Sequence, residues 1–145
     1  MSLILEECIE FNDERKICVA EENGKKYNLN NPFGFTLRKV KIDKCLDRHI
    51  GEKRCDYLMD CVDLKRVIFI ELKGGDLNKA VVQIYSTIVY LKNEFINYRI
   101  DARIVGSRDV PKFNNTPAYR RLAKYVIPTG GRIERATNNI YIENI

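Results

Sequence analysis

The chain has 145 residues, of which 45% are hydrophobic and 31% are charged, and its formal net charge is +5. This length suits one domain over residues 1–145, and the composition is ordinary for a globular protein with a buried core. The longest apolar run is far too short to span a bilayer, which excludes a membrane-spanning helix. The acidic start, with Glu6 and Glu7 where a signal peptide carries basic residues, argues against secretion.

The cysteines also bear on the cellular compartment. There are five of them: Cys8, Cys18, Cys45, Cys55 and Cys61. Their number is odd and none belongs to a C-x-x-C pair, so we expect reduced thiols in a cytoplasmic protein and no zinc site.

Apolar periodicity and turn signals predict a mixed α/β protein. The expected elements, in chain order, are a helix or alternatively a strand over 2–11, a hairpin around Asn23-Gly24, strands over 35–43, 55–62 and 67–73, a helix over 77–91, a strand over 100–105, a helix over 117–126, and a final hairpin from residues 133 and 140–142. Asp76 and Thr116-Pro117 supply the start signals of the two long helices. Short connections favour a meander of the three consecutive strands. The strand at 100–105 follows a helix and is expected to pair in parallel, which gives an α+β mixed sheet with helices on it.

The central stretch is the strand at 67–73, which ends in Glu71-Leu72-Lys73 and is followed by Gly74-Gly75. Residues two apart in a strand point to the same face, so Glu71 and Lys73 are expected side by side. Placing opposite charges at the end of an otherwise apolar strand costs desolvation. These two residues are therefore the first candidates for chemistry.

Asp56 is the second candidate, because its strand is joined to the central strand by a short turn. That pairing can bring its carboxylate beside Glu71 and Lys73. Two adjacent carboxylates repel each other unless a cation lies between them, and oxygen ligands of this kind suit Mg²⁺. A lysine beside such an ion can orient a water molecule for attack on phosphorus.

Asp56 followed by Glu71-Leu72-Lys73 at the end of a hydrophobic strand, and then by a helix, resembles the PD-(D/E)xK nuclease superfamily. The resemblance covers roughly the first two thirds of the chain and implies a restriction-endonuclease-like αβββαβ core, a central mixed sheet flanked by helices. It implies that Asp56 and Glu71 bind the metal with the Leu72 carbonyl as a third ligand, and that Lys73 serves the attacking water. The residue before Asp56 is Cys55, where the family pattern has proline.

Accessory residues follow from the same resemblance. Gln83 on the helix after Lys73 is either an accessory site residue or a solvated one, and Glu10 is a candidate further carboxylate from the first segment. Asp43 is the fallback acid if the strand register differs, and Asp60 shares the face of Asp56.

The sole histidine, His49, has no nucleophile motif near it, which argues against a hydrolytic triad. The basic second half predicts a polyanionic partner, and its candidate phosphate contacts are Arg108, Lys112, Arg120, Arg121 and Lys124.

These features together predict a Mg²⁺-dependent endonuclease that hydrolyses DNA, with Mn²⁺ as a substitute ion. The proteins it looks like act in bacterial defence and mobile elements. A chain this small can wrap little duplex, so a homodimer is expected, with a further protein partner left open. The alternatives are an RNA-directed nuclease, or a non-catalytic nucleic-acid-binding or scaffold protein on the same fold.

Overall fold

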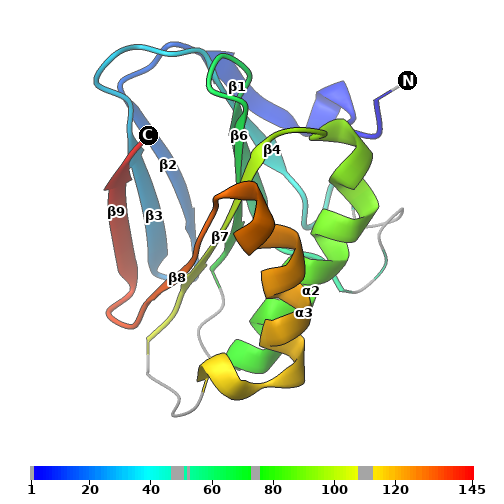
Figure 1. The fold of residues 1–145 in the computed structure, drawn as a ribbon. Coiled ribbons are helices and arrows are strands. Elements are labelled where there is room, and N and C mark those ends of the chain that lie inside the picture. The colour runs from blue at the N-terminus through cyan, green and yellow to red at the C-terminus, as the bar shows by residue number, and fades with distance from the viewer. Residues whose placement is uncertain (1, 47–50, 52, 73–75, 108–112) are drawn as a thin grey trace.

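The computed structural model describes residues 2–46, 51, 53–72, 76–107 and 113–145, and these form three layers (Figure 1). A six-stranded sheet lies in the middle. Helices α2 (Leu77–Leu91) and α3 (Pro117–Val126) cover one of its faces, and a three-stranded sheet covers the other. The expectation of a mixed α/β protein is confirmed. The second face carries strands in the described part of the chain, where helices were expected.

The central sheet has the strand order β1-β4-β5-β6-β7-β8. Its strands are β1 (Ile9–Asp13), β4 (Leu37–Lys41), β5 (Tyr57–Cys61), β6 (Arg66–Glu71), β7 (Arg99–Val105) and β8 (Ile133–Ala136). The predicted meander is confirmed, since β5 pairs antiparallel with both β4 and β6. The predicted parallel pairing of β7 with β6 is confirmed as well, and β8 adds a further parallel strand.

The N-terminal segment is a strand. A 3-10 turn, η1 (Glu6–Cys8), leads into β1, which pairs antiparallel with β4. The helix expected over 2–11 is therefore wrong, and the alternative strand is correct for its second half. The apolar spacing of this segment is compatible with both periods, and the open edge of β4 decides between them because it supplies backbone partners to an extended chain.

The smaller sheet consists of β2 (Ile17–Glu22), β3 (Lys25–Asn30) and β9 (Ile140–Asn144). The predicted hairpin of β2 and β3 is confirmed. The predicted hairpin of the last two strands is wrong, because β8 pairs with β7 and β9 pairs in parallel with β3. These two neighbouring strands thus join different sheets.

Strand β6 is buried on both faces, which accounts for its uninterrupted apolar run. Val67 and Phe69 belong to the core beneath the helices. Ile68, Ile70 and Leu72 belong to the core between the two sheets. Each long helix begins at its predicted cap. Asp76 accepts a hydrogen bond from the Lys79 backbone N–H, and Thr116 accepts one from that of Tyr119.

Short 3-10 turns complete the described elements: η2 (Lys92–Glu94), η3 (Phe113–Asn115) and η4 (Ile127–Thr129). None of the helices in the described ranges has the length and apolar character needed to cross a membrane.

Cys8 and Cys45 form a disulfide bond. The expectation that all five cysteines are reduced is therefore wrong for this pair. Packing of η1 against the loop after β4 brings their Cα atoms to 5.7 Å, inside the range that a disulfide can bridge. Cys18, Cys55 and Cys61 are free, buried thiols.

Candidate functional site

Asp56 is held by the strands on both sides of it. Its backbone N–H donates to the Ile70 carbonyl at 3.2 Å, and its own carbonyl accepts from the Ile42 N–H at 2.9 Å. One carboxylate oxygen, Oδ2, accepts from the backbone N–H of Leu72 at 2.7 Å. Asp56 is 1% exposed, so its carboxylate is fixed at the point where β5 begins and β6 ends.

Three carboxylates gather at this point. Glu22, Asp43 and Asp56 each offer an oxygen atom, and these atoms lie within 4.8 Å of one another. Glu22 ends β2 of the small sheet, whereas Asp43 follows β4 of the central sheet, so the group bridges the two sheets. Asp43 and Asp56 are buried and Glu22 is half-buried.

The pKa of Glu22 shows that the three carboxylates repel one another. Burial, the charge and hydrogen bond of Asp56, and the charge of Asp43 all raise the pKa of Glu22, and the Lys41 charge opposes them only in part. Asp43 has a counter-ion of its own, because Arg54 Nε lies 2.8 Å from its Oδ1. A hard divalent cation would relieve the remaining repulsion, and carboxylate oxygens are the donors it prefers.

The Glu71 side chain lies on the face of β6 opposite to Ile70 and Leu72. It is fully buried, and by alternation it shares the helix-facing side of Val67 and Phe69. After burial, the Glu71 charge is the main cause that raises the pKa of the Cys55 thiol on that side. Among the described residues, Glu71 is not a member of the three-carboxylate group. Lys73 lies outside the described residues, so the joint ligand set of Asp56, Glu71 and the Leu72 carbonyl stays a prediction.

Helix α2 positions the residue before Asp56. The Cys55 backbone N–H donates to Thr87 Oγ1 at 2.9 Å, and that hydroxyl donates to the carbonyl of Gln83, also at 2.9 Å. Gln83 is 4% exposed, so its interpretation as a solvated residue is wrong. Sequence reasoning missed Thr87. Its signal is a hydroxyl on the apolar face of a helix, where it needs buried partners.

The other candidate acids are engaged elsewhere. Lys39 Nζ lies 2.8 Å from Glu10 Oε1, and Arg38 Nε lies 2.8 Å from Asp60 Oδ1. Sequence reasoning also missed Glu22, which lies in the charged hairpin Glu21-Glu22-Asn23-Gly24 and looks like a solvated turn residue. Only the packing of the small sheet on the central sheet brings it to Asp56.

The predicted phosphate contacts fall into two groups. Arg120, Arg121 and Lys124 are exposed on α3, and their binding to nucleic acid stays a prediction. Arg108 and Lys112, like His49, lie outside the described residues.

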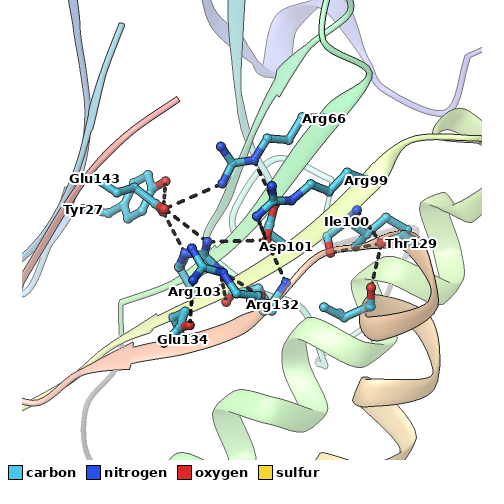
Figure 2. A network of polar contacts seen from close by, with 12 residues as sticks. Tyr27, Arg66, Arg99, Ile100, Asp101, Arg103, Thr129, Arg132, Glu134 and Glu143 are labelled. Carbon is cyan, nitrogen blue, oxygen red and sulfur yellow. Dashed lines mark hydrogen bonds and ion pairs between the residues drawn. The ribbon is translucent and has the colours of Figure 1, made fainter.

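Arg99, Arg103 and Arg132 of the second half belong to a network of polar contacts where the two sheets meet (Figure 2). Arg103 is fully buried, and its Nε lies 2.7 Å from Glu143 Oε2. The same oxygen accepts from the Tyr27 hydroxyl at 2.7 Å. Asp101 is also fully buried and pairs with Arg66 and Arg99 at 2.8 and 2.9 Å. The basic second half is therefore only partly a surface feature.

Two members of this network, Asp101 and Arg103, are favoured in their charged forms. Burial opposes ionisation of Asp101, but the Arg132 backbone N–H and the three neighbouring guanidinium groups outweigh it and lower the pKa of Asp101. Burial alone would lower the pKa of Arg103, yet the hydrogen bond and charge of Glu143, together with Asp101, raise it. The ion pair of Arg103 with Glu143 thus joins β7 to β9 and links the two sheets.

Comparison with known proteins gives no relative from which to take a function. No protein-family model, no curated protein and no solved structure matches the chain at a significant level.

Proposed function

We propose that the protein is a divalent-metal-dependent nuclease that hydrolyses phosphodiester bonds in DNA. The observation that carries this proposal is the approach of the Glu22, Asp43 and Asp56 carboxylates to within 4.8 Å, with Asp56 bonded to the end of β6. The antiparallel β4-β5-β6 meander, followed by α2 and parallel β7, agrees with the order expected for a restriction-endonuclease-like core.

The roles of the residues follow from their positions. Asp56, with Glu22 and Asp43 beside it, would hold the metal ion, with the Leu72 carbonyl at the strand end as a further ligand. Glu71 keeps its predicted role as a ligand, although its side chain lies on the helix-facing side of β6. Mg²⁺ bound there would supply positive charge to a scissile phosphate and would lower the pKa of a bound water. Lys73, two residues beyond Glu71, is proposed to orient the attacking water. Arg120, Arg121 and Lys124 are proposed to contact the nucleic-acid backbone.

The test is a cleavage assay with Mg²⁺, with Mn²⁺ and without a divalent ion, on supercoiled, linear and single-stranded DNA and on RNA. Wild type is expected to cut DNA only with metal, and Asp56→Asn and Lys73→Ala are expected to abolish cutting. Asp63→Asn is the matched control, since Asp63 is an exposed acid in the turn between β5 and β6.

The other outcomes separate the alternatives. Cutting of RNA in place of DNA would change the substrate class. If the variants fold normally and cut as fast as wild type, the proposed site is wrong. Tight, salt-sensitive binding of nucleic acid without cutting under any condition would favour a non-catalytic binding protein. A homodimer, expected from the small size of the chain, is checked in the same preparations by light scattering.

A further inference from the structure

A cavity lined by arginines lies at the opposite end of β6 from Glu71. Its volume is about 410 Å³, and its polar lining consists of Arg66, Arg99, Arg132, Glu143 and Asn144. Arg66 begins β6 whereas Glu71 ends it, so the cavity is separate from the three-carboxylate group. The volume falls in the lower part of the range of small-molecule pockets, about 300–1,000 Å³.

Two guanidinium groups converge there on one carboxylate, as Figure 2 shows. The Nε atoms of Arg66 and Arg99 lie 2.8 and 2.9 Å from the same oxygen, Oδ2 of Asp101. The buried Nε of Arg99 makes this ion pair without a hydrogen bond. Each guanidinium carries five N–H donors. The contacts within the described ranges provide no acceptor for Nη1 of Arg66 or Arg99, so these arginines have donors to spare beside the cavity.

The charged side chains that line the cavity are mostly cationic. Among the described residues, three arginines line it, Arg66, Arg99 and Arg132, against one side-chain carboxylate, that of Glu143. Glu143 lines the cavity, but Arg103 and Tyr27 already hold its carboxylate. An anion entering the cavity would thus meet three guanidinium groups.

We infer that this cavity binds a phosphomonoester group through Arg66, Arg99 and Arg132. Guanidinium forks match the oxygens of a phosphate and bind it in bidentate fashion, and a phosphomonoester carries more charge than a carboxylate. Leu64 and Ile145 add an apolar wall for the organic part of the ligand. The group would come from a free nucleotide or from the phosphorylated end of a nucleic-acid strand. The inference does not depend on the proposed metal site.

The test is calorimetric titration of the full chain in metal-free buffer with inorganic phosphate, a nucleoside monophosphate and the unphosphorylated nucleoside. Both phosphate-bearing probes are expected to bind, with affinity that falls as salt is raised, and the nucleoside is expected not to bind. If wild type binds neither phosphate-bearing probe, or binds the nucleoside equally well, the inference is wrong.

Variants at the two more exposed arginines locate the binding. The side chains of Arg99 and Arg132 are 38% and 63% exposed, so substitution there spares the core. Arg99→Gln and Arg132→Gln are each expected to weaken binding of the monophosphate about tenfold or more. Arg99→Lys keeps the charge but loses the fork, and it is expected to fall between wild type and Arg99→Gln.

Lys92→Gln is the matched control, because it removes one exposed positive charge on η2, away from the cavity lining. Weakening of binding by Lys92→Gln as large as that by Arg132→Gln would contradict the assignment. Thermal unfolding of each variant verifies that it is folded.

The source of the phosphate is decided by two further titrations. A 5′-phosphorylated oligonucleotide is compared with the mononucleotide and with the same oligonucleotide bearing a 5′-hydroxyl. If the phosphorylated oligonucleotide binds more tightly than both the mononucleotide and the 5′-hydroxyl oligonucleotide, the cavity is assigned to a strand end. Tighter binding of the mononucleotide would assign it to a free nucleotide. Because no metal is added, failure here leaves the proposed nuclease site untouched, and failure of the cleavage assay leaves this cavity untouched.

Discussion

The carboxylate of Asp56 accepts a hydrogen bond from the backbone N–H of Leu72 at 2.7 Å. The acid that precedes β5 is thereby fixed to the residue that follows β6. Both residues are buried, so the bond is shielded from water. A single side chain therefore serves two purposes here, since it closes the end of the strand pair and presents its carboxylate to Glu22 and Asp43.

Substitutions of Asp56 should separate these two purposes. Asp56→Ala leaves a buried N–H without an acceptor, and we expect the free energy of unfolding to fall by about 1–3 kcal/mol. Asp56→Asn keeps an acceptor oxygen and should cost less, yet both variants should lose metal-dependent cleavage. Denaturant unfolding in metal-free buffer checks the first part and the cleavage assay checks the second. Equal stability of the two variants would show that the hydrogen bond contributes little.

Glu22 should make stability depend on pH. Its pKa is raised in the folded protein, so the folded state holds this proton more tightly than the unfolded chain does. Stability from this group is therefore present at low pH and is lost as pH rises through the raised pKa. Glu22→Gln removes the titration, so the variant should be more stable than wild type at neutral pH. Below the ordinary pKa of 4.5 the difference should vanish.

Metal provides the second readout for Glu22. Mg²⁺ should raise the unfolding temperature of wild type at neutral pH more than that of Glu22→Gln, because binding to the folded state stabilises it. Thermal unfolding with and without Mg²⁺ measures both effects. An unfolding temperature of Glu22→Gln below that of wild type at neutral pH would contradict the repulsion argued here.

The disulfide between Cys8 and Cys45 closes a loop with a sequence separation of 37 residues. Loop-closure entropy predicts that its reduction lowers the free energy of unfolding by about 4 kcal/mol. Unfolding in denaturant with and without a reducing agent measures this loss, and Cys45→Ser should reproduce it without reductant. Insensitivity of wild type to the reductant, under conditions that reduce the bond, would contradict the expectation.

Gly131 packs against the backbone of β7. A Cβ atom placed there would lie 1.7 Å from the carbonyl oxygen of Ile100, and a backbone atom cannot yield as a flexible side chain can. Gly131→Ala should therefore destabilise the fold by at least about 2 kcal/mol. Gly130→Ala is the matched control. Gly130 has a φ of +86° but open space around it, and its variant should cost only about 1 kcal/mol. A smaller loss at Gly131 than at Gly130 would contradict this packing.

The ion pair between Arg103 and Glu143 joins β7 to β9 across the two sheets. Glu143→Gln leaves the buried guanidinium without that counter-charge and should destabilise the protein by about 3 kcal/mol. The double variant Arg103→Met with Glu143→Leu should recover part of the loss. Tyr27→Phe removes one hydrogen bond and should cost about 1 kcal/mol. Denaturant unfolding of wild type and the three variants measures these losses, and a loss in the double variant as large as or larger than that in Glu143→Gln would contradict the expectation.

Elements that depend on local signals could be predicted from the sequence. The apolar run of β6, the hairpin at Asn23-Gly24 and the caps Asp76 and Thr116 all act within a few residues, and the structure confirms each. The predicted position of Asp56 beside the end of β6 is also confirmed, because a short turn joins β5 to β6.

The remainder depends on distant segments. The three-carboxylate group requires the small sheet to pack on the central one, and the residue pattern around Glu22 carries no sign of that. The burial of Arg103 likewise depends on Glu143, which comes from the other sheet. The pairing of Cys8 with Cys45 likewise follows from the docking of η1 beside the loop after β4.

The parallel pairing of β3 with β9 sets the order in which the layers can be completed. Tyr27 and Glu143, which meet across these strands, are 116 residues apart in the sequence. During synthesis the β2-β3 hairpin can form before β9, but its second edge and the buried charge of Arg103 have no partner until β9 is made. Closing so long a loop is slow, because the chain loses conformational entropy before the stabilising contacts form. Between the synthesis of β3 and that of β9, the growing chain therefore exposes an unpaired strand edge and the apolar face behind it.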